Sequence, residues 1–337
     1  MRALAAALPD DLVTGYRSGV ELARPLPGDD LRVVAVGMGG SGIAFDLARS
    51  VVEAESRTSL SIVRSPELPR SVDARTEVLV ASYSGNTWES LTAYDAAGRA
   101  GARRTVLTSG GALLERAERD GVPILPLPPG LPPRSAVGQM LGGVFGLLDS
   151  SFPESLETRI AGAAEATRER IRHYARARGP AAGLAERVGN HLPFFYAERS
   201  FIALARRWKT QVEENAKRPA VFDEVPELFH NAIVAWDAMA HRDAAKYVVV
   251  LLEWSAEPPP VRASCRYLAH LLRSKGVEVA QVALSAEDRL EAVVSGVALG
   301  DHLSLFLADR GHVDPYPFDA ITRLKSAVGN PAHNRPS

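Results

Sequence analysis

Two short segments of the chain gather small polar residues and glycines in a way that suits the binding of a phosphate group. Residues 78–91 read VLVASYSGNTWESL, an apolar run followed by Ser82, Ser84, Asn86 and Thr87 at one turn. The apolar run predicts a buried strand, and the residues from 88 onward suit a helix. The polar cluster would then lie at the carboxyl end of a strand and at a helix N-terminus, where unpaired N–H groups and a partial positive charge favour an anion.

A purely structural interpretation of these side chains is also open, because Ser, Thr and Asn are common N-cap residues. One such residue would decide nothing. Four of them at a single turn favour an anion site over a simple cap, and the glycine among them lets the backbone approach a ligand closely.

Residues 37–47, GMGGSGIAFDL, form a second turn of similar chemistry. Gly37, Gly39 and Gly42 also satisfy G-x-G-x-x-G, the pattern of a dinucleotide-binding site. That alternative predicts an acidic residue about 20 positions further on, whereas the next strand, LSIVRS, ends in Arg64. An NADP site tolerates an arginine, so the alternative stays open. The second serine-rich turn favours phosphate binding, because a dinucleotide site does not need it.

Strand-like and helix-like segments alternate along the chain, which predicts parallel α/β sheets. In the first half, strands are expected at residues 31–37, 60–63, 77–83, 103–108 and 122–127, and helices at 43–52, 88–98 and 113–119. A proline-rich stretch at 126–135 and a long arginine-rich helix within 151–179 separate the halves. In the second half, strands are expected at 192–198, 246–254 and 277–284, and helices at 200–218, 261–276, 287–311 and 314–329. We therefore expect two doubly wound parallel-sheet subdomains with flanking helices, comprising residues 1–150 and 151–337.

The composition excludes several classes of function. Lys and Arg number 39 against 40 Asp and Glu, so no bulk charge points to nucleic acid or to an anionic membrane surface. Cys265 is the only cysteine, which excludes an internal disulfide and suits a reducing compartment. The N-terminal apolar stretch is too short for a signal segment, and residues 136–148 are too few to span a bilayer. We expect a cytoplasmic protein, and the histidines show no metal-ligand spacing, so we expect no metal site.

The motifs resemble those of a known family. The segments GMGGSGI and SYSGNT resemble the sugar isomerase (SIS) domain family. Three later segments, RWKTQVEENAK, ELFHNAIVAW and DPYPFDAITRLK, resemble one branch of it, the bifunctional phosphoglucose/phosphomannose isomerases of archaea and bacteria. The resemblance extends from about residue 30 to residue 326, and the later three motifs are the more specific ones.

The resemblance implies two SIS subdomains, a homodimer, and reversible isomerisation of glucose 6-phosphate or mannose 6-phosphate to fructose 6-phosphate, without a metal or organic cofactor. Arg134 matches the arginine that stabilises the enediolate, and Glu214 matches the catalytic base. His230 and Lys325 match the ring-opening pair, with the histidine supplied by the neighbouring subunit. Phosphate binding is carried over to Gly40, Ser41, Ser82, Ser84 and Thr87.

The residue types suit this chemistry. A single carboxylate can move a proton between two neighbouring carbons, and an arginine suits the oxyanion that develops. Helical spacing places an apolar stripe on one side of residues 200–218 and a polar stripe, which includes Arg207, Gln211 and Glu214, on another. Glu213 and Glu214 are about 100° apart on a helix, so only one can point into a site. The spacing does not choose between them, and the resemblance selects Glu214.

Each assigned residue also has an ordinary structural interpretation. Without the resemblance, Glu214 would be a surface helix acid, His230 a partly buried structural histidine, Lys325 a surface lysine and Arg134 a loop arginine. Tyr316 stands where the family has a small residue, often threonine, so its ring is expected to narrow the substrate range. A non-catalytic phosphosugar sensor is the alternative function, because such a protein needs the phosphate turns but no base.

Overall fold

The computed structural model describes residues 1–24, 31–284, 286–317 and 319–328. Its contacts form two compact units. The N-terminal unit comprises Ala7–Ala164 and Pro317–Ser337, and the C-terminal unit comprises Met1–Ala6 and Glu165–Tyr316. The domain limits expected at residues 1–150 and 151–337 stay a prediction.

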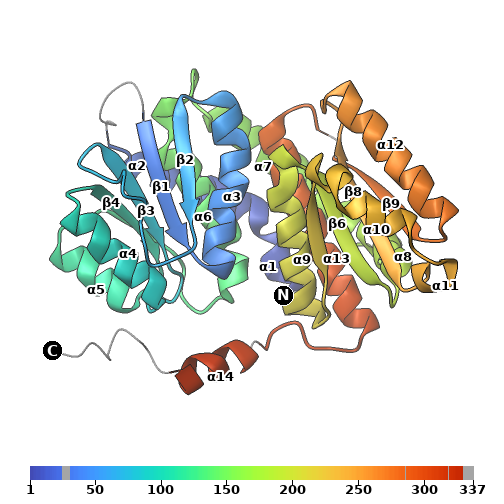
Figure 1. The fold of residues 1–337 in the computed structure, drawn as a ribbon. Helices are drawn as coiled ribbons and strands as arrows, with labels where there is room; N and C mark the ends of the chain where they lie inside the picture. The colour runs from blue at the N-terminus through green and yellow to red at the C-terminus, as the bar shows by residue number, and fades with distance from the viewer. Residues whose placement is uncertain (25–30, 285, 318, 329–337) are drawn as a thin grey trace. The chain divides into compact units, whose positions relative to one another are not determined.

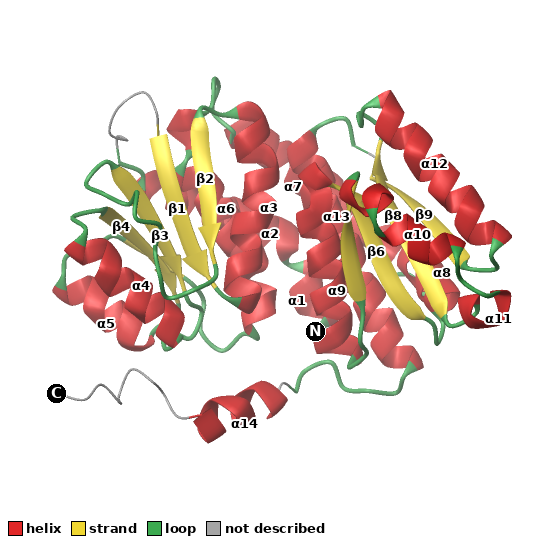
Figure 2. Cartoon of the chain, viewed as in Figure 1, coloured by secondary structure: helices red, strands yellow, loops and turns green. Residues whose placement is uncertain are grey.

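A five-stranded, wholly parallel sheet forms the centre of the N-terminal unit (Figure 2). Its strands are β1 (Leu31–Gly37), β2 (Thr58–Val63), β3 (Thr76–Ala81), β4 (Arg103–Thr108) and β5 (Ile124–Pro126). They lie in the order β2-β1-β3-β4-β5, so the direction of winding reverses between β1 and β3. In open α/β sheets, ligands bind outside the carboxyl ends of the strands at this reversal.

Helices cover both faces of this sheet, α4 and α5 on one face and α2, α3 and α6 on the other (Figure 1). The helices of the unit are α2 (Leu8–Leu22), α3 (Gly39–Glu55), α4 (Trp88–Arg99), α5 (Gly111–Arg119), η1 (Pro133–Ala136), α6 (Val137–Leu147), η2 (Asp149–Ser151) and α14 (Asp319–Val328). Helix α7 (Glu157–Tyr174) continues into the C-terminal unit. Glycines let α2 and α6 pack backbone to backbone, since a Cβ at Gly142 would lie 2.0 Å from the Leu12 carbonyl oxygen. The glycine-rich stretch therefore serves helix packing.

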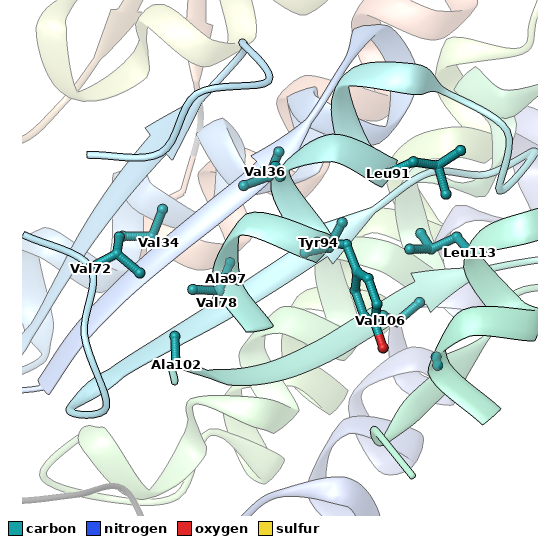
Figure 3. Packing of buried hydrophobic residues seen from close by; sticks show 13 residues of the cluster. Val34, Val36, Val72, Val78, Leu91, Tyr94, Ala97, Ala102, Val106 and Leu113 are labelled. Atoms are coloured by element: carbon teal, nitrogen blue, oxygen red, sulfur yellow. The ribbon is translucent and has the colours of Figure 1, made fainter. Parts of the chain in front are cut away.

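The core beneath α4 and α5 fixes the turn that leads into α4. Val78 and Val106 of the sheet pack with Leu91 and Tyr94 of α4 and Leu113 of α5 in one buried cluster (Figure 3). Each such side chain contributes about 1.5–3 kcal/mol when it is fully buried. Because β3 and α4 share this cluster, the short connection between them is held at both ends.

The C-terminal unit repeats the architecture with four parallel strands in the order β7-β6-β8-β9. The strands are β6 (Leu192–Glu198), β7 (Val221–Val225), β8 (Tyr247–Trp254) and β9 (Glu278–Leu284). The helices are α1 (Arg2–Ala6), α8 (Pro180–Val188), η3 (Arg199–Phe201), α9 (Ile202–Ala216), η4 (Glu227–His230), α10 (Ala232–Asp237), α11 (His241–Ala244), α12 (Pro259–Ser274) and α13 (Arg289–Arg310). Helices α10 and α12 lie on one face of the sheet, and α8, α9 and α13 lie on the other (Figure 1).

The two parallel sheets with flanking helices confirm the predicted fold class. Among the strands, the sequence pattern misses β7, because its five residues, VFDEV, include two acids and form the edge of the sheet. It also misses helices α2, α8 and α10. Among the described residues, α13 alone is long and apolar enough to cross a membrane, and 89% of its apolar window is buried within the fold. Such burial is typical of the core helix of a soluble protein.

Candidate active site

The turn after β3 is compact and partly bonded to itself. The Ser82 hydroxyl donates to Thr87 Oγ1 at 3.0 Å, and Ser84 Oγ accepts from the backbone N–H of Asn86 at 3.3 Å. Gly85 has a φ of +66°, a left-handed conformation that favours glycine. Ser82 is buried, Thr87 is half-buried and Ser84 is exposed. The turn therefore presents hydroxyls at several depths at the carboxyl end of β3.

The turn after β1 lies beside it. Ser41, 5% exposed in the first turn of α3, accepts a hydrogen bond through its Oγ from the backbone N–H of Tyr83 at 3.1 Å. A Cβ at Gly42 would lie 2.4 Å from the Gly37 carbonyl oxygen, so glycine is needed where α3 starts against the end of β1. The two serine-bearing turns are thus joined directly at the reversal point of the sheet.

The helix starts at these turns lack side-chain caps. Helix α3 has Met38 as its N-cap and α4 has Thr87, and neither residue makes a side-chain capping hydrogen bond. Thr87 is therefore the N-cap residue of α4 by position, but its hydroxyl does not cap the helix. First-turn N–H groups that no side chain caps are the groups to which a phosphate oxygen binds at a helix N-terminus.

Arg134 is brought to the same edge by η1. A Cβ at Gly40 would lie 2.9 Å from the backbone nitrogen of Arg134 and 3.0 Å from its Cα, so the start of α3 and η1 touch through their backbones. The Arg134 side chain is 2% exposed. The structure thus gathers Gly40, Ser41, Ser82, Thr87 and Arg134 around neighbouring loops of one unit.

The turn after β4 supports this arrangement from the other side. A Cβ at Gly85 would lie 1.7 Å from the Gly110 carbonyl oxygen, and the Gly85 carbonyl accepts from the Leu113 N–H at 2.9 Å. The Asn86 side chain accepts from the Ala112 N–H at 3.1 Å and donates to the Ser84 carbonyl at 3.0 Å. Asn86 therefore serves the turn itself, which explains one of the four polar residues at this position.

Arg64, the residue that could contact the extra phosphate of NADP in the dinucleotide alternative, makes an ion pair within the fold. Its guanidinium pairs with Asp46, a carboxylate of α3 that is 6% exposed. This ion pair ties the end of β2 to α3, which gives Arg64 a structural role. The geometry favours a phosphate-binding turn over the dinucleotide alternative.

Glu214 lies near the C-terminal end of α9 in the C-terminal unit and is half-buried. Its neighbour Asn215 is buried and donates through Nδ2 to the Ser304 hydroxyl of α13 at 2.9 Å. Glu213, by contrast, pairs with Lys209 one turn earlier at 2.6 Å. Both acids are half-buried, and the choice of Glu214 over Glu213 stays a prediction.

A buried ion pair fixes α9 further along. Arg207 binds Asp301 of α13 through two nitrogens, at 3.0 and 2.7 Å, and Gln211 donates to the same carboxylate at 2.9 Å. Arg207 is 1% exposed and Gln211 3%. The predicted polar stripe is therefore buried at these two residues, because Asp301 supplies them with a partner in the interior.

The remaining predicted residues lie in short or peripheral elements. His230 ends η4 and is exposed, and η4 follows β7 directly. Lys325 lies in α14, and its side chain is outside the described residues. Tyr316 is 48% exposed and its N–H donates to Asp314 Oδ1 at 2.9 Å. The roles of these residues stay predictions.

Carboxylates lie at the carboxyl edge of the second sheet. Glu257, 3% exposed, follows β8 and accepts through Oε1 from the Trp254 N–H at 3.0 Å, while its buried Oε2 has no partner among the described residues. Burial raises the pKa of Glu257 to about 7, with further contributions from Glu198 and Glu253. Negative charge at this edge would disfavour the binding of an anion.

Two further groups of observations complete the site. Across the part of the chain that the structure describes, no three His, Cys, Asp or Glu side chains are arranged to hold a metal ion.

Tyr83, which the sequence pattern does not single out, contacts three neighbouring loops. The available signal for it is indirect: a tyrosine between two site serines, and a proline-rich stretch whose few N–H groups need acceptors.

Comparisons with known proteins identify relatives of this chain. Residues 177–328 match the family described as the bacterial phospho-glucose isomerase C-terminal SIS domain. The chain is 32% identical to the bifunctional phosphoglucose/phosphomannose isomerase of Caldicellulosiruptor bescii, covering 95% of this chain and 96% of the relative. It is 32% identical to the enzyme of the same name from Aquifex aeolicus, covering 88% and 90%.

Solved structures show the same fold at lower identity. The tagatose-6-phosphate ketose/aldose isomerase of Escherichia coli superposes with a TM-score of 0.69 at 15% identity, covering 94% of this chain and 96% of that one. The resemblance read from the motifs is confirmed by the identity over nearly the full length of the relatives. The chain belongs to the family of the bifunctional phosphoglucose/phosphomannose isomerases.

Proposed function

We propose that the protein catalyses the reversible isomerisation of glucose 6-phosphate, mannose 6-phosphate or both to fructose 6-phosphate through a cis-enediol. One observation carries the proposal: the hydrogen bond from the Tyr83 N–H to Ser41 joins two serine-bearing turns where the sheet winding reverses, with the backbone of Arg134 against Gly40. The turns that carry the proposed phosphate-binding residues and the buried residue Arg134 thus meet at one edge of one sheet, which supports the proposal. Family membership then supplies the reaction.

In the proposed mechanism, the phosphate of the sugar is held by Gly40, Ser41, Ser82, Ser84 and Thr87 together with the N-termini of α3 and α4. His230 and Lys325 open the sugar ring by moving a proton from O1 to O5. Glu214 takes the proton from C2 and returns it to C1, while a second proton passes from O2 to O1, so that the aldose becomes the ketose without net loss of a proton. Arg134 stabilises the negative charge that develops on the enediolate oxygen.

The proposal includes a cytoplasmic homodimer in which His230 is donated by the neighbouring subunit. Two observations support a partner at this surface. His230 is exposed, and Val234 of α10, one turn further along, is 67% exposed. An exposed apolar side chain beside an exposed titratable one suits a surface that another subunit covers.

The test begins with the native protein and fructose 6-phosphate, with the aldose products identified and the ratio of glucose 6-phosphate to mannose 6-phosphate measured. Replacing Glu214→Gln removes the proton acceptor while keeping the side-chain volume. We expect kcat to fall by about 10²–10⁴-fold, the usual contribution of a general base. Inhibition by inorganic phosphate should not change, because the phosphate residues are untouched.

Glu213→Gln is the matched control, since it is the same substitution on the adjacent residue. It removes only the partly exposed pair with Lys209, which is worth about 0.2–1 kcal/mol, so kcat should stay at the native value. If Glu214→Gln keeps full activity, the assignment of Glu214 as the catalytic base is refuted. A native protein that binds phosphosugar without turnover would instead be a phosphosugar sensor.

A further inference from the structure

Tyr83 lies at the centre of the loops that form the proposed site. It is 7% exposed and sits between Ser82 and Ser84. Its N–H donates to Ser41 Oγ at 3.1 Å, and its carbonyl accepts from the Ser109 hydroxyl at 2.6 Å and from the Ser109 N–H at 3.1 Å. Its backbone therefore connects the turns that follow β1, β3 and β4.

The Tyr83 side chain reaches a fourth segment, which leads to Arg134. The hydroxyl donates to the Pro128 carbonyl at 2.6 Å and accepts from the Leu131 N–H at 2.7 Å. Leu131 precedes Arg134 by three residues. Both hydrogen-bonding functions of one hydroxyl thus hold the chain immediately before η1.

Residues 126–133 have few backbone N–H groups with which to hold the segment in place. Five of the eight residues from 126 to 133 are proline, and proline has no N–H to donate. Of the three residues that keep an N–H, Leu127 donates to the Thr108 carbonyl at 2.9 Å and Leu131 donates to Tyr83. The Tyr83 hydroxyl therefore supplies one of the few acceptors that position this stretch, which would otherwise depend on the stiffness of its prolines.

We propose that Tyr83 is a positioning residue: through Pro128 and Leu131 its hydroxyl sets the place of Arg134 relative to the phosphate-binding turns. This inference rests on the proposed function, in which Arg134 stabilises the enediolate. Tyr83 itself acts through Arg134 and does not contact the reacting atoms. The backbone of Tyr83 serves the phosphate turns and its hydroxyl serves Arg134, so the two roles can be separated by substitution.

The test is Tyr83→Phe, which removes the hydroxyl and keeps every backbone contact. Arg134 would lose part of its alignment, and a misplacement of about 1 Å can cost about 100-fold in rate, so we expect kcat to fall about 10- to 100-fold. KM and the inhibition constant of inorganic phosphate should stay within about twofold of native, because Ser41 and Ser109 keep their bonds to the backbone of residue 83.

Tyr94→Phe is the matched control. Tyr94 is fully buried in the same unit, and its hydroxyl donates to Asp120 Oδ2 at 2.9 Å and to the Arg116 carbonyl at 3.3 Å. It should lose a comparable amount of stability in thermal unfolding and keep native kcat. If Tyr94→Phe lowers kcat as much as Tyr83→Phe, the effect is a general loss of stability and the positioning role is refuted.

A double-mutant cycle shows whether Tyr83 acts through Arg134. In the Arg134→Lys background, which keeps the charge and loses the fork, Tyr83→Phe should cause no further fall in kcat. Equal falls in both backgrounds would overturn the proposal. If Tyr83→Phe does not fold, hydrogen exchange of the Leu131 amide in the native protein tests the proposal instead. We expect slow exchange, because this N–H donates to the Tyr83 hydroxyl, and exchange at the rate of an unprotected amide would overturn the proposal.

The failure of this proposal differs from the failure of the proposed function. If the native protein has no isomerase activity, both the proposed function and the role of Tyr83 are refuted. A native protein that isomerises fructose 6-phosphate, together with a Tyr83→Phe variant of unchanged kcat, removes only the role of Tyr83.

Discussion

Gly85 is the residue at which the close packing of the site loops can be tested most directly. Replacing Gly85→Ala would place a Cβ 1.7 Å from the Gly110 carbonyl oxygen, where ordinary contacts begin at 3.4 Å. The turns after β3 and β4 would have to separate by about 1.7 Å, the difference between these two distances. The φ of +66° adds backbone strain of about 1–2 kcal/mol for any residue with a side chain.

Separation of the turns would also break the hydrogen bonds between them. The bond from the Leu113 N–H to the Gly85 carbonyl and the bond from the Ala112 N–H to Asn86 Oδ1 each contribute about 0.5–1.5 kcal/mol. Together with the strain, Gly85→Ala should lower the free energy of unfolding by about 2–5 kcal/mol. The displaced turn carries Ser84 and Thr87, so inorganic phosphate should also inhibit the variant more weakly.

Gly101→Ala separates the strain from the clash. Gly101 has a φ of +71°, but a Cβ there would meet nothing within 4 Å. The control should therefore lose only about 1–2 kcal/mol and keep native phosphate inhibition. Urea unfolding followed by circular dichroism gives the stabilities. Equal losses in the two variants would refute the close approach of the turns, and a destabilised Gly85→Ala with native phosphate inhibition would refute the phosphate site.

Two other predictions concern Glu257 and the subunit interface. The pKa of Glu257 is raised from about 4.5 to about 7, so in this range the folded protein keeps a proton that the unfolded chain has released, and stability falls as the pH rises, by on the order of 3 kcal/mol in total. Glu257→Gln should flatten this slope in urea unfolding between pH 5 and pH 8, and an unchanged slope would contradict the burial of the charge. For the interface, inactive Glu214→Gln and His230→Ala proteins should regain part of the native activity after they are unfolded and refolded together, because a mixed dimer would hold one intact site. Recovery that never exceeds the sum of the separate samples would contradict the shared site.

The local features of the site follow from neighbouring residues, and the sequence pattern predicts them well. The strand that ends at Ala81, the polar turn and the helix Trp88–Arg99 depend on the burial period and the turn residues of one continuous segment. The link from Tyr83 to Pro128 and Leu131 does not, because it joins residues 45 and 48 positions apart. Nothing in the residue pattern states that these segments meet.

Long-range partners also explain what the sequence pattern leaves out. Helical spacing predicts a polar stripe that includes Arg207 and Gln211, but it does not state what these side chains contact. They are buried because Asp301, about 90 positions further on, offers a carboxylate to both. Strand β7 is missed for a related reason: it pairs only with β6 at the edge of the sheet, so its residues need not be uniformly apolar.

The ion pair between Arg207 and Asp301 sets the rotational phase of α9 about its own axis. A turn of the helix by one residue would carry Arg207 away and leave the Asp301 carboxylate without its cation in the interior, at a cost of about 3–5 kcal/mol. At about 1.4 kcal/mol per factor of ten, about one molecule in 100 to one in 4,000 would then adopt the turned helix. The direction in which Glu214 points therefore depends on α13 as much as on α9. A chimaera that exchanged α9 or α13 alone would change the direction of the Glu214 side chain. Exchanging both helices together would keep that direction.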